Sequence, residues 1–313
     1  MKSGWFRPVS YAGWEIAWMR VFLAIAVYLA FGKIQTFPAA EVEIGLGGGM
    51  NLSLFHQPGG GLGKGVFGLL PRNLFQIIVL IGMLVYASGR LGWLVLPVVT
   101  FLFIGTATLN TSQGSIQHHL QAGAMLLVVL SLWYVGCAIW NKTVPLRALS
   151  LEKVHRFVPF FAIQVLAATY VVAGISKLEK SGIGWIADTR FAPVALRKTA
   201  DQHFFSVTDH LPERASGLFD GLPVLVRGFF LECPWAAGPL LGPGLFLELF
   251  AFLALAGRRA ALVVGLLIIG FHYAVSEVMN LRFEMNTHLL LIFMVNVPFW
   301  VGLGWRKGVA RFG

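Results

Sequence analysis

Long apolar runs separated by short polar segments dominate the hydrophobic pattern of this chain. A transmembrane α-helix needs about 20 mainly apolar residues to cross a bilayer. Eight runs approach that length, and each predicts one spanning helix: residues 14–34, 73–89, 91–110, 119–140, 156–176, 239–256, 259–276 and 288–304. Pro97 and Pro159 fall inside two of these spans, where neighbouring helices can satisfy the freed carbonyls. The pattern predicts an all-α, polytopic integral membrane helix bundle.

The composition agrees with a membrane protein. Of 313 residues, 57% are hydrophobic and 12% are charged, whereas soluble domains carry roughly 25% charged residues. The net charge of +10 is explained by the excess of basic residues in cytoplasmic loops of membrane proteins. No basic tract is interleaved with aromatic residues, so nucleic acid is not expected as a partner. Two cysteines, Cys137 and Cys233, are too few for a disulfide framework.

Lysine and arginine are distributed unequally between alternate loops. With the N-terminus inside, the short outer turns contain only Arg282, and the inner segments contain Lys2, Arg7, Arg90, Lys142, Arg147, Lys153, Arg156, Arg258, Arg259, Arg306, Lys307 and Arg311. Short loops rich in Lys and Arg stay in the cytoplasm. We therefore expect a multi-pass protein of the cell inner (cytoplasmic) membrane with both termini cytoplasmic.

Two longer loops then face outward. Residues 35–72 are glycine-rich, but "HQPGGGLGKG" lacks the Ser or Thr of a phosphate-binding loop and predicts a flap. Residues 177–238 include "TRFAPVALRKTADQHFF", whose mixture of apolar and basic residues is typical of a helix in the membrane interface. The whole chain, 1–313, is expected to form a single transmembrane domain with these two extracytoplasmic loops.

Ionisable residues within membrane spans usually mark function. In this chain most of those within or beside the spans lie toward the outer half, and Glu248 lies near the middle of the sixth span. They are His118, His119, Lys177, Glu248, His272, Glu277, Glu284 and His288. Each has a structural alternative: lysines can reach the headgroups as anchors, histidines can cap helices, and Glu277 can pair with Arg282. Glu248 needs either a partner or a proton, because a lone carboxylate is costly in the membrane.

A metal site is not expected among these residues. Neither H-E-x-x-H nor E-x-x-H occurs within a span, and the spacing in "EMNTH" does not suggest that Glu284 and His288 share one helical face. Helical metal sites use such i, i+3 or i, i+4 pairs.

The segment "QVLAATYVVAGISKLEKSGIGW" resembles the signature of the horizontally transferred transmembrane (HTTM) family, which is similar to the membrane domain of the vitamin K-dependent gamma-glutamyl carboxylase. The matching positions are Tyr170, Ala173, Gly174, Lys177, Leu178 and Trp185. Gln117–His118 and Phe271–His272 resemble two further family segments. Here "EKSGIG" lengthens the motif, and only "RKGVARFG" follows the last span. The large luminal domain of the animal carboxylases, and propeptide recognition of that type, are therefore not expected.

The resemblance implies a membrane enzyme, carboxylase- or epoxidase-like, hence a lyase or oxidoreductase. Lys177 would be the catalytic base, and His118 or His272 would hydrogen-bond the oxyanion of a reduced vitamin K-type quinone. Residues expected to line the quinone site are His119, Tyr170, Glu248, Glu277 and His288. A lysine acts as a base only when neutral, and burial favours neutral amines.

The second substrate would be a peptide or a small molecule. The other expected partner is the lipid bilayer. Two other functions stay open: a small-solute or lipid transporter, and a non-catalytic scaffold that binds a partner through loop 177–238. The chain lacks the internal repeat that many transporters have.

Overall fold

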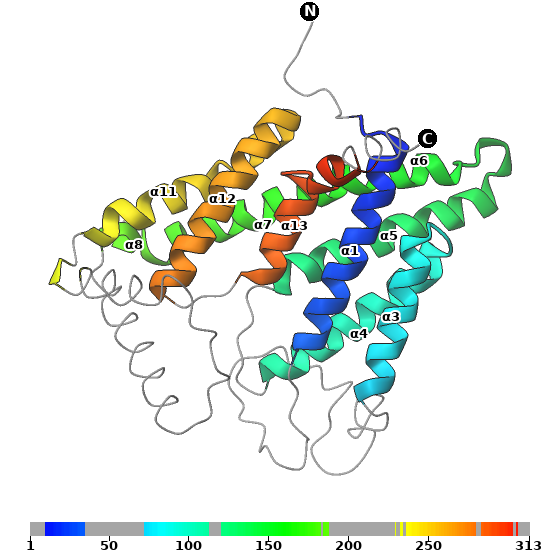
Figure 1. Cartoon of the computed structure of the whole chain (residues 1–313), viewed down its shortest axis with the longest axis horizontal. Helices are drawn as coiled ribbons and strands as arrows, with labels where there is room; N and C mark the ends of the chain where they lie inside the picture. The colour runs from blue at the N-terminus through cyan, green and yellow to red at the C-terminus, as the bar shows by residue number, and fades with distance from the viewer. Residues whose placement is uncertain are drawn as a thin grey trace, which may run out of the picture. The chain divides into compact units, whose positions relative to one another are not determined.

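The computed structural model describes residues 10–34, 72–112, 120–182, 184–187, 236–279 and 283–302, together with residues 229, 232, 233 and 305. Every regular element in these ranges is a helix (Figure 1). The all-α fold class is therefore confirmed for the part of the chain that the structure describes. Loops 35–72 and 177–238 lie largely outside it.

The chain divides into two compact units. One consists of Met1–Leu166 and Glu284–Gly313, which we call unit 1, and the other is Ala167–Phe283, which we call unit 2. The single domain expected over residues 1–313 stays a prediction.

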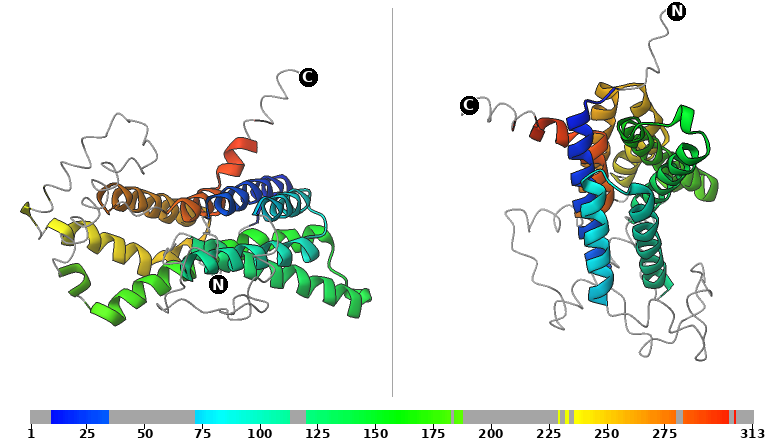
Figure 2. Two further views of the ribbon diagram at one scale, coloured as in Figure 1. Left: turned by 90° about the horizontal axis from the view of Figure 1, so that it is seen from below. Right: turned by 90° about the vertical axis from the view of Figure 1, so that its right-hand side faces the viewer.

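Unit 1 is built on apolar helices that pack along their lengths. They are α1 (Gly13–Lys33), α3 (Arg72–Ala87), α4 (Gly92–Ser112), α5 (Gln121–Thr143) and α13 (Glu284–Phe293). Helices α1 and α3 lie side by side in both views (Figures 1 and 2), and α3 also packs on α4. Between α4 and α5, the Thr100 hydroxyl lies 2.7 Å from the Ser131 hydroxyl in the core. Such small polar residues hold membrane helices together.

The α3–α4 hairpin turns within the residues "SGRLG", as the sequence predicts. Gly89 has a φ of +81°, which favours glycine because it has no Cβ. A Cβ at Gly89 would also lie 2.5 Å from Nη1 of Arg20. Glycine is thus needed at this turn for its conformation and for the close approach of the α1 guanidinium.

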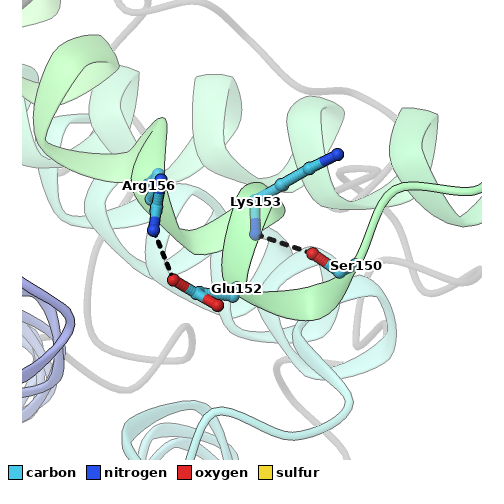
Figure 3. A network of polar contacts seen from close by, with 4 residues as sticks. All are labelled: Ser150, Glu152, Lys153 and Arg156. Atoms are coloured by element: carbon cyan, nitrogen blue, oxygen red, sulfur yellow. Dashed lines mark hydrogen bonds and ion pairs between the residues drawn. The ribbon is translucent and has the colours of Figure 1, made fainter.

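A short helix precedes the longest apolar helix. In α6 (Leu151–Arg156) the Ser150 hydroxyl caps the first turn by accepting from the Lys153 amide, and Arg156 pairs with Glu152 (Figure 3). A turn at Phe157 separates α6 from α7 (Val158–Ser181). Pro159 therefore occupies the first turn of α7, where no helical hydrogen bond is lost. Pro159 does lie inside a segment able to cross the membrane, Leu151–Ser181, but at the start of a helix, so no neighbouring helix has to satisfy a freed carbonyl there.

Unit 2 contains most of α7 and the helices that follow it. These are α8 (Gly184–Ala187), α11 (Ala237–Leu249), the 3-10 helix η5 (Ala251–Ala256) and α12 (Arg258–Met279). The sequence predicts one helix over 239–256, but the structure divides this stretch at Phe250. Glu248, expected near the middle of that span, consequently lies in the last turn of α11.

The C-terminal span is also interrupted. Helix α13 ends at Phe293, Asn296 has a φ of +58°, and residues 297–302 are helical again. The Asn296 side chain accepts from the Phe299 amide at 3.1 Å and donates to the buried carboxylate of Glu15 at 3.2 Å. The Asn296 side chain thus caps the last helical turns and connects them to α1 by a hydrogen bond.

Within the part of the chain that the structure describes, four helical segments are long and apolar enough to cross a membrane: Gly13–Lys33, Gln121–Thr143, Leu151–Ser181 and Arg258–Ser276. Two shorter apolar helices cover Asn73–Ala87 and Gly92–Ala107. Many large apolar side chains point outward on these helices, for example Leu84 (60% exposed) and Leu132 (68% exposed). Such a surface suits lipid, because monomeric soluble proteins rarely expose extensive apolar patches. These features identify a membrane protein.

Candidate functional site

An ion pair joins α7 to α11 inside unit 2. Nζ of Lys177 lies 2.6 Å from Oε1 and 2.6 Å from Oε2 of Glu248, a residue 71 positions later in the chain. The lysine side chain is 28% exposed and the glutamate side chain 10% exposed. The carboxylate expected to need a partner or a proton therefore has an ammonium partner.

Glycine lets the two helices approach at this point. Tyr170, Gly174 and Lys177 are spaced four and three residues apart, which places them on one face of α7. A Cβ at Gly174 would lie 3.0 Å from Cδ2 of Leu249 and 3.3 Å from Cβ of Glu248. Small residues commonly occupy such close helix contacts in membranes. The glycine of the motif thus permits the packing that brings Lys177 to Glu248.

A second close approach positions α12 against α11. Gly244 precedes Glu248 by one turn, and a Cβ there would lie 2.1 Å from the Phe271 ring. The next residue, His272, is 5% exposed and its ring centre lies 5.5 Å from that of Tyr170, which is 4% exposed. Phe283 stacks on the imidazole, with ring centres 4.3 Å apart and an interplanar angle of 11°.

Electrostatic interactions connect these residues into one group. The charge of the Glu248 carboxylate interacts with the Tyr170 hydroxyl, and the charge of the Lys177 amine interacts with the His272 ring. We call Tyr170, Lys177, Glu248 and His272 the Lys177 cluster. Three helices, α7, α11 and α12, contribute to it.

Two polar atoms of the Lys177 cluster lack hydrogen-bond partners. Oη of Tyr170 and Nδ1 of His272 are buried, and neither is hydrogen-bonded to any residue that the structure describes. An unsatisfied buried polar atom costs free energy, so each one calls for an explanation such as a bound water or ligand. The cluster therefore combines a charged pair with two atoms able to bind a polar ligand.

The structure places some of the predicted site residues and not others. Lys177, Tyr170, Glu248 and His272 come together, as expected for residues of one site. His118 and His119 lie outside the described residues, so the predicted convergence of His118 with Lys177 and His272 stays a prediction. Glu277 belongs to α12, but its side chain, like those of Arg282 and Trp185, is outside the described part.

His288 belongs to unit 1, where it lines a cavity formed by α1 and α13. The lining residues are Leu29, Ala30, Lys33, Glu284, Met285 and His288. Glu284 and His288 share this cavity because residues i and i+4 lie on the same helical face. The expectation drawn from "EMNTH" is wrong on this point. Among the described residues no three His, Cys, Asp or Glu side chains are grouped to hold a metal ion.

Sequence reasoning missed a polar link in unit 1. Tyr134 Oη lies 2.6 Å from Nδ1 of His155, and Nε2 of that ring lies 3.2 Å from the Gly89 carbonyl. A carbonyl only accepts, so Nε2 carries the proton and Nδ1 accepts from the tyrosine hydroxyl. His155 thereby joins α5 and α6 to the α3–α4 turn. Its position in an expected loop gave no signal of this role.

In comparisons with known proteins, no family model, no curated protein and no solved structure matches the chain.

Proposed function

We propose that this chain is an integral membrane enzyme of the vitamin K-dependent carboxylase-like (HTTM) type. In this proposal the Lys177 cluster binds a lipid-soluble hydroquinone and removes a proton from its hydroxyl group. The observation that carries the proposal is the Lys177–Glu248 ion pair, packed beside two buried polar atoms that have no hydrogen-bond partner among the described residues. The motif around Lys177 supports it independently.

The residues of the cluster fit such a ligand. A reduced quinone is a flat ring that supplies two weakly acidic hydroxyl groups, each able to donate and to accept a hydrogen bond. Oη of Tyr170 and Nδ1 of His272 can each bond one polar atom of that kind. The buried tyrosine and imidazole rings and Phe283 offer aromatic surface next to them.

The ion pair can accept one proton without a further partner. In its resting form Lys177 is an ammonium and Glu248 a carboxylate. Transfer of one proton from Nζ to the carboxylate yields a neutral amine and a neutral acid. The amine then takes the hydroxyl proton of the ligand, so that Lys177 is an ammonium again and Glu248 holds the extra proton. Lys177 makes the contact, and Glu248 is the net acceptor.

The membrane arrangement belongs to the same proposal. We infer eight spans in the inner membrane, with both termini cytoplasmic and loops 35–72 and 177–238 outside. The distribution of basic residues between short loops supports this orientation. Lys177, near the C-terminal end of α7, then lies toward the outer leaflet. His118 is proposed as a further hydrogen-bond donor of the site.

Substitution of Lys177 by Arg tests the catalytic role. Arginine keeps the charge and can still pair with Glu248, but it does not release its proton. We expect Lys177→Arg to insert and fold normally and to lose about 10²–10⁴-fold in hydroquinone consumption by reconstituted protein. The exposed Lys180 is the matched control, and Lys180→Arg should keep full activity. If Lys177→Arg turned over as fast as the parent, Lys177 would be an anchor and not a base.

A transporter is the alternative that the ion pair also favours, because buried carboxylates and amines form proton relays in membrane transporters. Lipid extraction of the detergent-purified protein, followed by mass spectrometry, separates the two. Bound quinone that is lost in the Tyr170→Phe, His272→Phe double variant supports the enzyme. Solute flux by quinone-free vesicles containing the protein would support the transporter.

A further inference from the structure

The cavity between α1 and α13 is lined by both polar and apolar side chains. Lys33, the last residue of α1, pairs there with Glu284, the first residue of α13. His288 follows Glu284 by one helical turn and lines the same cavity. Leu29, Ala30 and Met285 supply the apolar part. An ammonium, a carboxylate and an imidazole thus line the same cavity as three apolar side chains.

The ion pair at this cavity is open to exchange. The side chains of Lys33 and Glu284 are 63% and 37% exposed, and exposed ion pairs contribute little to stability. A ligand that offers an anion to Lys33 and a cation to Glu284 can therefore replace the direct contact without leaving either charge unpaired. The cavity is suited to a ligand with both charges.

An exposed apolar stripe leads along α1 to these charges. Ile25, Leu29 and Lys33 are spaced four residues apart and lie on one helical face, and Ile25 and Leu29 are 50% and 47% exposed. The helix Gly13–Lys33 is long and apolar enough to cross a membrane. Lys33 therefore lies at a membrane boundary, with the stripe running from it into the hydrocarbon layer.

We infer that this cavity binds the headgroup of a zwitterionic phospholipid with a primary amine, the phosphatidylethanolamine class. The lipid phosphate accepts hydrogen bonds from the Lys33 ammonium and from the His288 ring. The lipid ammonium donates to the Glu284 carboxylate, and an acyl chain lies along Ile25 and Leu29. A choline headgroup has no N–H to donate, and a glycerol headgroup has no cation for Glu284. The inference stands apart from the Lys177 cluster and holds whether or not the enzyme proposal succeeds.

Native mass spectrometry of the full chain tests the inference. The protein is purified in mild detergent and given an equimolar mixture of phosphatidylethanolamine, phosphatidylcholine and phosphatidylglycerol with identical acyl chains. We expect the parent to retain phosphatidylethanolamine preferentially. Glu284→Gln should lower its retention relative to phosphatidylglycerol by roughly tenfold, as for loss of one charged hydrogen bond. Lys33→Gln should lower the retention of both.

The Arg156–Glu152 pair provides the matched control. It is another exposed ion pair of unit 1, with side chains 62% and 66% exposed. Glu152→Gln removes the same charge and should leave the lipid ratios of the parent unchanged. A thermal midpoint for each variant shows that it is folded.

Three results would overturn the inference. The first is retention of the three lipids in proportion to the mixture. The second is an equal shift in Glu152→Gln. The third is displacement by soluble phosphoethanolamine at the concentration at which the lipid itself competes, which would show a site for a free small zwitterion. Stepwise N-methylation of the headgroup is a test on the parent protein alone, and retention must fall as N–H groups are removed.

Discussion

At the scale of single residues, the Lys177–Glu248 pair is costly to keep. Removing two opposite charges from water costs free energy that their attraction only partly returns, and apolar replacements of a buried pair are often neutral or stabilising. Glu248 is 10% exposed and Lys177 28%, so much of that cost applies here. A gain in stability is therefore a weak explanation for the pair, which is consistent with the function that we propose for it.

We expect the pair to behave non-additively when it is replaced. Glu248→Leu leaves the lysine ammonium without its carboxylate and should destabilise the protein by about 2–3 kcal/mol, less than a fully buried pair because Lys177 is partly exposed. The double variant Lys177→Met, Glu248→Leu should recover most of that loss. Unfolding in sodium dodecyl sulfate titrations measures both. Equal instability of the single and the double variant would contradict a coupled pair.

The sequence could indicate which single residues belong to the candidate site, but not how they pair. Tyr170, Lys177, Glu248 and His272 stand out because polar groups in apolar runs are rare and are usually functional. Their pairing could not be derived, because 71 residues separate Lys177 from Glu248 and contact between helices depends on tertiary packing. A carboxylate within an apolar run indicated that Glu248 needs a partner, but the sequence did not indicate that the partner is Lys177.

At the scale of elements, two glycines set the spacing of the site helices. Because Gly174 has no side chain, α11 can pack closely against α7. In the same way Gly244 leaves space for the Phe271 ring of α12. Since side chains fill protein interiors to crystal-like density, Gly244 has no room for a Cβ, and a larger residue at Gly174 requires the side chains of Leu249 and Glu248 to shift. The geometry of the Lys177 cluster follows from these contacts.

Leucine at Gly174 should separate α7 from α11. We expect Gly174→Leu to cost about 1–3 kcal/mol through overpacking and to reduce activity by weakening the Lys177–Glu248 contact. Gly270 in α12 is the control, because nothing lies within 4 Å of a Cβ built there. Gly270→Leu should be neutral or slightly stabilising, since leucine favours the helix more than glycine does. Similar losses in both variants would mean that helix packing at Gly174 is not special.

Asn296 offers a test of the break after α13. Asn296→Ala removes the cap of the Phe299 amide and the donor to Glu15, and it replaces asparagine at positive φ by a residue that adopts this conformation less readily. We expect a loss of about 1–3 kcal/mol in unfolding titrations. Asn296→Asp keeps the cap but places a carboxylate beside Glu15, so it should be at least as harmful. A stable Asp variant would contradict the Glu15 contact.

The apolar pattern predicted where helices occur but not where they break. The breaks at Phe157, Phe250 and Asn296 all fall within or at the ends of predicted spans. Hydropathy averages over about a turn or more, so a local change of backbone direction leaves it unaltered. Pro159 was a visible signal of the first break, because proline is favoured in the first helical turn. Phe250 and Asn296 depend on contacts that only the folded chain provides.

At the scale of the whole molecule, the exposed apolar side chains and the four long apolar segments require a bilayer. The orientation in that bilayer decides whether the Lys177 cluster works toward the outer or the cytoplasmic leaflet. The segment Leu151–Ser181 is the most useful reporter of it. Its 31 residues include the turn at Phe157, and the 24 residues of α7 alone extend roughly 36 Å, more than the hydrocarbon core of about 30 Å.

Labelling of single cysteines at the two ends of this segment tests the orientation. Leu146, 99% exposed in the turn before α6, should be cytoplasmic, and the exposed Ser181 at the end of α7 should be outside. The physical reason is the excess of Lys and Arg around residues 142–156. In chains freed of Cys137 and Cys233, an impermeant maleimide should label Ser181→Cys in intact cells. Leu146→Cys should react only after the cells are permeabilised.

Two other outcomes would contradict this orientation. The opposite labelling pattern would invert the topology and move the proposed site to the cytoplasmic leaflet. Labelling of both cysteines from outside would show that Leu151–Ser181 does not cross the membrane.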